Sequence, residues 1–311
     1  MAYDVIGGKV VTPEGIELNV TYHCNLGCAS CSHLSPLFRR TNADPAAAAA
    51  DLALLSRSFQ AQFVKVLGGE PLLHPELLTI LAAVRESGIA PKILLCTNGI
   101  LLPRMSEEFW AAVDEVEVSV YPGRELSPDD ARLVRQRAER SGTELRVEHY
   151  SYFRYSYSEV GTDDPELVSE IYSTCQIAHV WRCHTVFEGY FFKCPQSVFL
   201  PRAIGSPADP WADGLEIEQG PGFVDRLLAY LRSSEPLAAC RNCLGSAGLR
   251  TQHRQLKRKE FREPQNRSTE DLVDREFLAL LGRRPDADDG CTSTDLFSGH
   301  RPLLPTSREE N

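Results

Sequence analysis

Apolar and polar residues follow two distinct rhythms along the first half of the chain. Short runs with a period of two predict strands, and longer runs with helical spacing, bounded by serine, aspartate or glycine, predict helices. The predicted strands cover residues 17–22, 62–69, 92–99, 115–123 and 144–150. The predicted helices between them cover residues 44–59, 75–88, 106–114 and 127–142, with Asp44, Ser106 and Ser127 as N-caps.

This serial βα order predicts an α/β fold with a parallel sheet whose functional loops gather at the carboxyl ends of the strands. The rhythm stops after about residue 165. The segment "VWRCHTVFEGYFFKCP" at 180–195 predicts a hairpin with Gly189 in its turn. Residues 222–234 predict a helix, and residues 268–282 predict an amphipathic helix before a polar tail. We therefore expect three segments, 1–165, 166–255 and 256–311.

Composition and charge narrow the class of protein. The 311 residues are 42% hydrophobic, as in an ordinary globular protein, and the formal net charge is −10. That charge argues against a general nucleic-acid partner, and the basic stretch 250–262 is interpreted as a solvated helix face. The N-terminus lacks a signal-peptide pattern and no apolar run is long enough to span a bilayer, so we expect a cytoplasmic protein without a membrane partner.

Ten cysteines in such a chain favour metal ligands over disulfides, because the cytosol keeps thiols reduced. Cys24, Cys28 and Cys31 form the pattern C-x3-C-x2-C. Three thiolates on a tight loop can hold three irons of a [4Fe–4S] cube and leave the fourth iron open to a non-protein ligand. Structural zinc, with His23 or His33 as fourth ligand, and buried unligated thiols are the alternatives.

Three motifs at successive strand ends carry a family resemblance. The cysteine pattern after the first strand, "GGE" at 68–70 and "TNG" at 97–99 resemble the radical SAM superfamily over about residues 17–150. The resemblance implies a partial (β/α)6 barrel, S-adenosylmethionine (SAM) on the open iron, and a 5′-deoxyadenosyl radical that abstracts a substrate hydrogen. One departure is Ser30, where the family usually has an aromatic residue that packs on the adenine.

The resemblance also assigns SAM-binding roles to residues at the strand ends. The two glycines would allow close backbone approach, and the glutamate would accept hydrogen bonds from the methionine ammonium group. Three further residues would contact the methionyl carboxylate or the ribose, with strand-end capping as the alternative. The six candidates are Gly68, Gly69, Glu70, Thr97, Asn98 and Ser119.

Five of the ten cysteines lie between residues 175 and 243. Four of them, Cys175, Cys194, Cys240 and Cys243, are spaced as in the half-length auxiliary-cluster domain, called twitch, that follows the barrel in some radical SAM enzymes. The resemblance implies that they hold a second [4Fe–4S] cluster, and zinc is the alternative. The fifth, Cys183, is left over unless it takes the place of Cys175 as a ligand.

The expected substrate is a small molecule. Only 23 residues precede Cys24, so we expect no leader-binding domain of the kind that peptide-modifying relatives carry. A barrel with one auxiliary cluster resembles the sugar epimerases and aminocyclitol dehydrogenases of antibiotic biosynthesis. The resemblance implies a glycoside or aminocyclitol substrate and a reductant of the flavodoxin or ferredoxin type.

Three functions remain open: an epimerase, a dehydrogenase and a non-enzymatic iron–sulfur or zinc protein. We favour the epimerase, in which a thiol returns a hydrogen atom to the opposite face of the substrate carbon. A dehydrogenase would instead pass an electron to the auxiliary cluster and leave a ketone. Cys183 is the first candidate donor and Cys175 the alternative, while Cys96 is interpreted as strand packing and Cys291 lies in the tail. Four further side chains near strand ends could bind hydroxyl groups: Tyr121, Arg124, His149 and Tyr150.

Overall fold

The computed structural model describes residues 3–206, 209, 211–220, 222–257, 259–263, 265–288 and 292–296. Five parallel strands form the centre of the main sheet, as the sequence predicts. They are β3 (Ile16–Thr21), β5 (Phe63–Gly68), β6 (Lys92–Thr97), β7 (Glu115–Val120) and β8 (Glu144–Tyr150). A sixth parallel strand, β10 (His184–Phe187), lies beside β3 and not beside β8.

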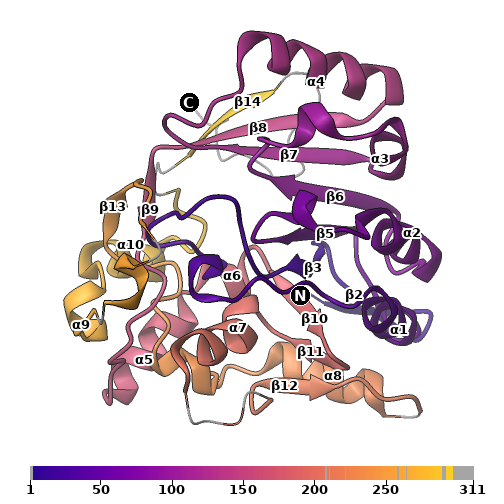
Figure 1. Cartoon of the computed structure of the whole chain (residues 1–311). Coiled ribbons are helices and arrows are strands. Elements are labelled where there is room, and N and C mark those ends of the chain that lie inside the picture. The colour runs from indigo at the N-terminus through magenta and orange to yellow at the C-terminus, as the bar shows by residue number, and fades with distance from the viewer. Residues whose placement is uncertain are drawn as a thin grey trace, which may run out of the picture.

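Three antiparallel strands complete this sheet in the described chain. They are β11 (Tyr190–Phe192), β12 (Gly214–Glu216) and β14 (Thr292–Leu296), and the full order is β12-β11-β10-β3-β5-β6-β7-β8-β14. Figure 1 shows the sheet running from β14 down to β12 without closing on itself. The fold is therefore an open, partial barrel, which confirms the predicted α/β class.

Four helices join the parallel strands and cover one face of the sheet (Figure 1). They are α1 (Pro45–Leu55), α2 (Leu77–Ser87), α3 (Glu107–Ala112) and α4 (Pro128–Ser141). Asp44, Ser106 and Ser127 cap α1, α3 and α4 through side-chain oxygens that accept backbone N–H groups, which confirms these predictions.

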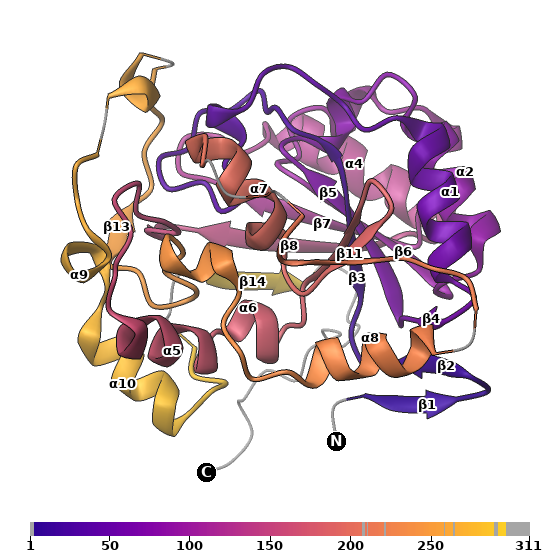
Figure 2. The same cartoon turned by 90° about the horizontal axis from the view of Figure 1, so that it is seen from below.

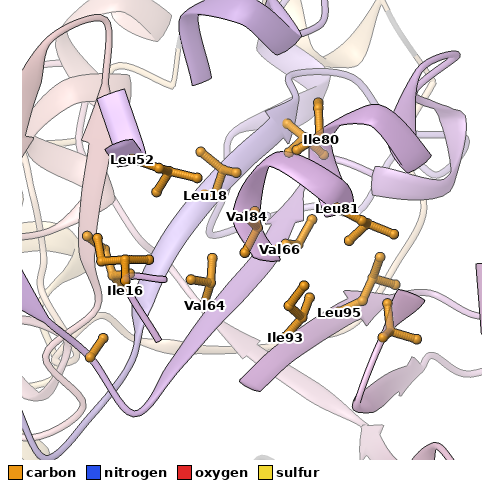
Figure 3. Close-up of a cluster of buried hydrophobic side chains, with 14 of the residues drawn as sticks. Ile16, Leu18, Leu52, Val64, Val66, Ile80, Leu81, Val84, Ile93 and Leu95 are labelled. Carbon is orange, nitrogen blue, oxygen red and sulfur yellow. The ribbon is translucent and has the colours of Figure 1, made fainter. Parts of the chain in front are cut away.

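The core lies between this face and the helices. Figure 3 shows alternate residues of β3, β5 and β6 pointing at Leu52 of α1 and at Ile80, Leu81 and Val84 of α2. Because strand side chains alternate between faces, the intervening residues, such as Glu17 and Lys65, must point to the inner face. The helix-facing half of each strand therefore holds the fold together and leaves the other half free for function.

The second half of the chain departs from the expected separate domain. The predicted hairpin forms as β10 and β11 with Gly189 at φ 82° in its turn, but it extends the main sheet because β10 pairs with β3. A small sheet near the N-terminus, β1 (Asp4–Ile6), β2 (Lys9–Val11) and β4 (Phe59–Gln60), was not predicted. Figure 2 shows β2 beside α8 (Phe223–Arg232), the helix expected at 222–234.

Two predictions for the C-terminal third are wrong in detail. The basic stretch is not a helix, because β13 (Arg250–Gln252) pairs with β9 (Tyr152–Arg154) and a 3-10 turn, η5 (Glu260–Arg262), follows. The helix expected at 268–282 splits into α9 (Thr269–Leu272) and α10 (Arg275–Arg283), because Asp274 caps a new start by accepting the N–H of Phe277. The tail contributes β14, and Cys291 lies outside the described residues.

The remaining elements are short. They are η1 (Ser35–Leu37), η2 (Pro71–Leu73), η3 (Leu102–Arg104), α5 (Pro165–Ser173), α6 (Gln176–His179), α7 (Pro195–Ile204) and η4 (Ala238–Arg241). No helix in the described ranges combines the length and the apolar character needed to cross a membrane.

Candidate active site

The carboxyl ends of β3 and β5 pack backbone against backbone. The N–H of Gly69 donates to the carbonyl of Thr21 at 2.6 Å, and the N–H of Glu70 donates to the carbonyl of His23 at 3.0 Å. A Cβ on Gly68 would lie 2.3 Å from the Thr21 oxygen, and a Cβ on Gly69 would lie 2.1 Å from the His23 oxygen. The two glycines are therefore required to bring the cysteine loop against β5.

Glu70 ties the ends of β5 and β6 together. Its carboxylate is fully buried and accepts the N–H of Leu72 at 3.1 Å, the hydroxyl of Thr97 at 2.6 Å and the N–H of Asn98 at 2.9 Å. Burial raises the pKa of Glu70 to about 7, although these three donors act in the opposite direction. These three bonds hold the carboxylate in place at the strand ends. Its contact with the SAM ammonium group remains a prediction.

Cys24, Cys28 and Cys31 lie near enough for their thiols to raise one another's pKa, in addition to the larger effect of burial. Burial raises the pKa of Cys24 and Cys28 to about 12. Backbone N–H groups lie near the sulfurs: that of Leu26 donates to Cys24 Sγ at 3.3 Å, and those of residues 33–35 act to lower the pKa of Cys31. Such donors favour the thiolate form and so fit iron ligands.

Within the described ranges, no three His, Cys, Asp or Glu side chains are gathered to hold a single metal ion. A [4Fe–4S] cube gives each thiolate its own iron, so its ligands need not converge on one point. The donors to Cys24 and Cys31 and the positions of the three thiols on one loop fit that group. When bound there, the cluster and SAM would supply the radical chemistry that the resemblance implies.

Two side-chain amides complete the hydrogen bonding of these thiols. Asn98 Nδ2 lies 3.6 Å from Cys24 Sγ and donates to Asn25 Oδ1 at 2.7 Å. Gln255 Nε2 donates to Cys28 Sγ at 3.2 Å, while its Oε1 accepts the N–H of Gly27 at 2.7 Å. Asn98 was expected as a SAM contact, which remains a prediction, whereas Gln255 was missed because no local pattern links it to residues near position 28.

Ser30, the departure from the family pattern, has a left-handed backbone with φ 58°. It lines a pocket of about 200 Å3 together with Cys28, Cys31, Tyr157 and Arg254. Ser119 is half-buried on β7, and Tyr121 just beyond it stacks on His253 at 4.9 Å between ring centroids. The predicted SAM contacts of Thr97, Asn98 and Ser119 stay predictions, and Thr97 already bonds Glu70.

The four predicted auxiliary ligands come together from three separate stretches of chain. The thiols of Cys175, Cys194, Cys240 and Cys243 act on one another's pKa, which burial raises above the usual range. Cys175 and Cys194 occupy the N-cap positions of α6 and α7, and the N–H of Gly245 donates to Cys243 Sγ at 3.3 Å. This donor set fits a second cluster, which remains a prediction.

The inner face of the sheet carries a polar layer that the sequence analysis missed. Lys65 Nζ lies 3.7 Å from Glu117, Arg146 pairs with Glu117, and Arg146 Nε lies 3.6 Å from Glu115. The Lys65 side chain is 28% exposed, so solvent reaches this face. The signal was present in the alternation of "FVKVLG" and "EVEVSV", because a parallel strand packed on both faces is normally apolar throughout.

Cys183 belongs to this polar layer. It follows Arg182, whose φ of 47° turns the chain just before β10, and its thiol lies close enough to the Glu17 carboxylate for each group to shift the pKa of the other. Desolvation raises the pKa of Cys183 well above the usual value, so the sulfur keeps its proton at neutral pH. Cys194 is close enough to contribute to that shift.

Two further features of the polar layer involve the carboxylates of Glu17 and Glu117. Glu17 is 7% exposed, and its Oε2 has no hydrogen-bond partner among the described residues. Cys96 also faces the polar layer, close enough to Glu117 for each group to shift the pKa of the other, so its expected role as simple strand packing is incomplete. Two thiols, Cys183 and Cys96, therefore border the inner face.

Comparison with known proteins identifies the central part of this fold. Residues 18–148 match the Radical SAM superfamily, so the chain carries a radical SAM domain. This confirms the resemblance drawn from the three strand-end motifs. The superfamily implies SAM and one [4Fe–4S] cluster.

Individual relatives match about a third of this chain. A GTP 3′,8-cyclase of Geobacter sulfurreducens is 28% identical over 109 residues, 34% of this chain and 33% of its own length. A probable GTP 3′,8-cyclase of Sulfolobus acidocaldarius is 29% identical over 122 residues, 38% of this chain and 36% of its own length. The match thus spans about a third of each relative.

Two solved structures show a weaker likeness. The complex of BtrN with AdoMet and 2-DOIA has a TM-score of 0.39 and 15% identity over 74% of this chain and 92% of that chain. Streptococcus suis SuiB has a TM-score of 0.35 and 19% identity over 45% of this chain and 33% of that chain. These scores are too low to support an inference about function.

Proposed function

We propose that the protein is a radical SAM enzyme that epimerises a carbinol carbon of a sugar or aminocyclitol in natural-product biosynthesis. The radical SAM domain supports the initiating chemistry, and the position of Cys183 supports the epimerase over the other functions. The substrate class rests on the resemblance of the architecture to antibiotic-pathway enzymes, and not on the matched cyclases, since their match covers only about a third of either chain.

Cys183 carries the proposal. It is the cysteine left over from the four auxiliary thiols, and it borders the inner face beside Glu17 and Lys65. A hydrogen-atom donor must keep its S–H bond until the substrate radical forms, and the raised pKa of Cys183 meets that requirement. Cys175, the alternative donor, has its sulfur among the other three auxiliary thiols.

The inner polar layer would hold the substrate. Hydroxyl and amine groups of a sugar need charged or polar partners, and Glu17 offers a carboxylate oxygen that has none among the described residues. In the proposed step the adenosyl radical removes a hydrogen atom from one face of the carbon. The Cys183 S–H bond then breaks as a new C–H bond forms on the other face. One electron from an external reductant and one proton return the sulfur to a thiol.

The test uses the anaerobic, iron-loaded enzyme with SAM, dithionite and a panel of aminocyclitols and amino sugars in D2O. We expect 5′-deoxyadenosine and a product with one deuterium at the inverted carbon, since the S–H proton exchanges with solvent. Cys183→Ala should still form 5′-deoxyadenosine but no inverted product. Cys96→Ala is the matched control, because it removes the other inward thiol, and it should still invert the substrate.

Other outcomes would reassign the roles. Loss of about four irons in Cys183→Ala would make Cys183 a ligand and move the donor role to Cys175. Loss of inversion in Cys96→Ala alone would make Cys96 the donor. A ketone product without solvent deuterium would favour the dehydrogenase.

A further inference from the structure

Lys193 is a fully buried lysine whose side chain donates only to uncharged oxygens in the described chain. The residue is 1% exposed, and its Nζ donates to the hydroxyl of Tyr172 and to the carbonyl of Ser233, each at 2.8 Å. No carboxylate of the described residues lies close enough to act on the pKa of Lys193. An ammonium group is almost never fully buried without an anion, because the loss of hydration costs free energy. The position of Lys193 therefore implies a compensating negative charge close by.

Two tyrosine rings enclose this ammonium group. Nζ lies 5.6 Å from the ring centroid of Tyr172 and 5.4 Å from that of Tyr230. The face of an aromatic ring attracts a cation through its quadrupole, but the ring carries no net charge. The Tyr230 hydroxyl also accepts the backbone N–H of Lys193 at 3.0 Å, which fixes the ring beside the lysine. These contacts hold the ammonium group in place and leave its charge uncompensated.

The other ionisable side chains around Lys193 do not supply the missing charge. The carboxylate of Asp213 is buried, but its two oxygens accept backbone N–H groups at the start of η4, at 2.6 and 2.8 Å. Burial lowers the pKa of His179 and of His184, and the charge of Lys193 adds to that effect. An imidazole can add only positive charge. The compensating anion must therefore lie elsewhere.

The auxiliary thiols are the groups that lie close enough. Burial lowers the pKa of Lys193, while the thiols of Cys194 and Cys240 act in the opposite direction and favour its charged form. Tyr172, whose hydroxyl accepts from Lys193, packs against Cys175 and Cys240. Four thiolates around a [4Fe–4S] cluster or a zinc ion carry more negative charge than the metal offsets. Such a centre would supply the anion that Lys193 lacks.

We propose that Lys193 balances the negative charge of a thiolate-bound cluster at the four auxiliary cysteines and thereby raises its reduction potential. The inference goes beyond the proposed function, because it rests on the predicted second cluster and not on the epimerase reaction. Reduction adds one electron and makes such a cluster more negative, so a nearby cation stabilises the reduced form more than the oxidised form. Lys193 makes the centre easier to reduce without being a ligand.

The experiment is a redox titration of the anaerobic, iron-loaded enzyme with dithionite, followed by electron paramagnetic resonance. The variant in which Cys24, Cys28 and Cys31 are all alanine identifies the signal of the auxiliary cluster. Lys193→Gln removes the charge and keeps a hydrogen-bond donor. At a fixed potential we expect its ratio of reduced to oxidised auxiliary cluster to fall at least about tenfold, a shift of about 59 mV for one electron. Lys193→Arg keeps the charge and should stay closer to the wild-type potential.

Two matched variants separate the charge from other effects. Lys92→Gln makes the same chemical change at an exposed position and should keep the wild-type potential. Tyr172→Phe removes a hydrogen-bond acceptor of Lys193 but no charge, so it should shift the potential less than Lys193→Gln does. Equal shifts in Tyr172→Phe and Lys193→Gln would overturn the inference, because they would assign the effect to the hydrogen bond.

Iron and sulfide assays decide the remaining outcomes. Loss of about four irons in Lys193→Gln, with the first cluster retained, would also support the inference, because the charge would then be needed to hold the auxiliary cluster. Loss of both clusters, an unchanged potential, or the same shift in Lys193→Arg would overturn it. Wild-type enzyme with a single cluster, or with zinc at the auxiliary cysteines, would overturn it as well. None of these results bears on the proposed function, which the inverted product in the Cys183 test decides.

Discussion

At the scale of single residues, hydrogen bonds to sulfur are the most informative contacts. Gln255 reaches Cys28 Sγ from a segment distant in sequence, and Asn98 reaches Cys24 Sγ from the end of β6. A donor to a thiolate stabilises the more negative, reduced form of an iron–sulfur site more than the oxidised form. With a cluster bound, these two amides would influence electron uptake without being ligands.

Gln255→Leu should lower the reduction potential of the cluster at Cys24, Cys28 and Cys31. Loss of about 1 kcal/mol of preferential stabilisation corresponds to about 40 mV for one electron. The measurement is a redox titration followed by electron paramagnetic resonance, with iron content determined in parallel. Gln252→Leu, at an exposed position in the same segment, should leave the potential unchanged. An unchanged potential in Gln255→Leu at full iron content would contradict the role assigned to this amide.

At the scale of elements, the two faces of each strand have different roles: one packs on the helices and the other carries polar residues. Residues such as Val64 and Val66 of β5 pack on α1 and α2, while Lys65 between them points into the polar layer. Helix α2 shows the same division, with Leu81 buried in the core and Leu78 exposed. The stability of the barrel should therefore depend on one face of each element only.

Leu81→Ala should lower the free energy of unfolding by about 2–5 kcal/mol, because it removes a buried side chain and leaves a cavity. Leu78→Ala in the same helix should change it by less than about 0.5 kcal/mol, since that side chain is 43% exposed. Urea denaturation followed by circular dichroism measures both variants. Comparable losses in the two would show that α2 does not pack on the sheet as described.

At the scale of the whole molecule, two groups of cysteines are assembled around one sheet. The first group lies on a single loop, and the second is brought together from α6, α7 and η4 with the residues that follow it. Cys183 lies between the second group and the polar layer, since it interacts with both Cys194 and Glu17. The hairpin of β10 and β11 produces this arrangement by joining the sheet next to β3.

The anaerobically reconstituted protein should hold about eight irons and eight sulfides per chain, on the expectation of two [4Fe–4S] clusters. Changing Cys24, Cys28 and Cys31 together to alanine should leave about four irons, whereas Cys96→Ala should retain about eight. Iron and sulfide assays with visible absorbance measure this. Stoichiometric zinc without an iron–sulfur absorbance band would contradict the two-cluster assignment.

The sequence alone determined the features that depend on neighbouring residues. The βα order, the three helix caps and the superfamily motifs were all predicted. Periodicity, capping and the C-x3-C-x2-C spacing each depend on residues that are only a few positions apart in the sequence. The split between α9 and α10 was also local, since Asp274 is an ordinary N-cap, but it was missed.

Only the tertiary structure decided which distant segments meet. It paired β10 with β3, set Gln255 on Cys28 and residues 254–256 on the cysteine loop, and brought the Cys183 thiol beside Glu17. Each of these contacts joins residues more than 150 positions apart, and their cause is the packing of whole elements. A hydrogen bond or strand pairing over such a separation leaves no periodic trace in the sequence, so it becomes visible only when the elements are in place.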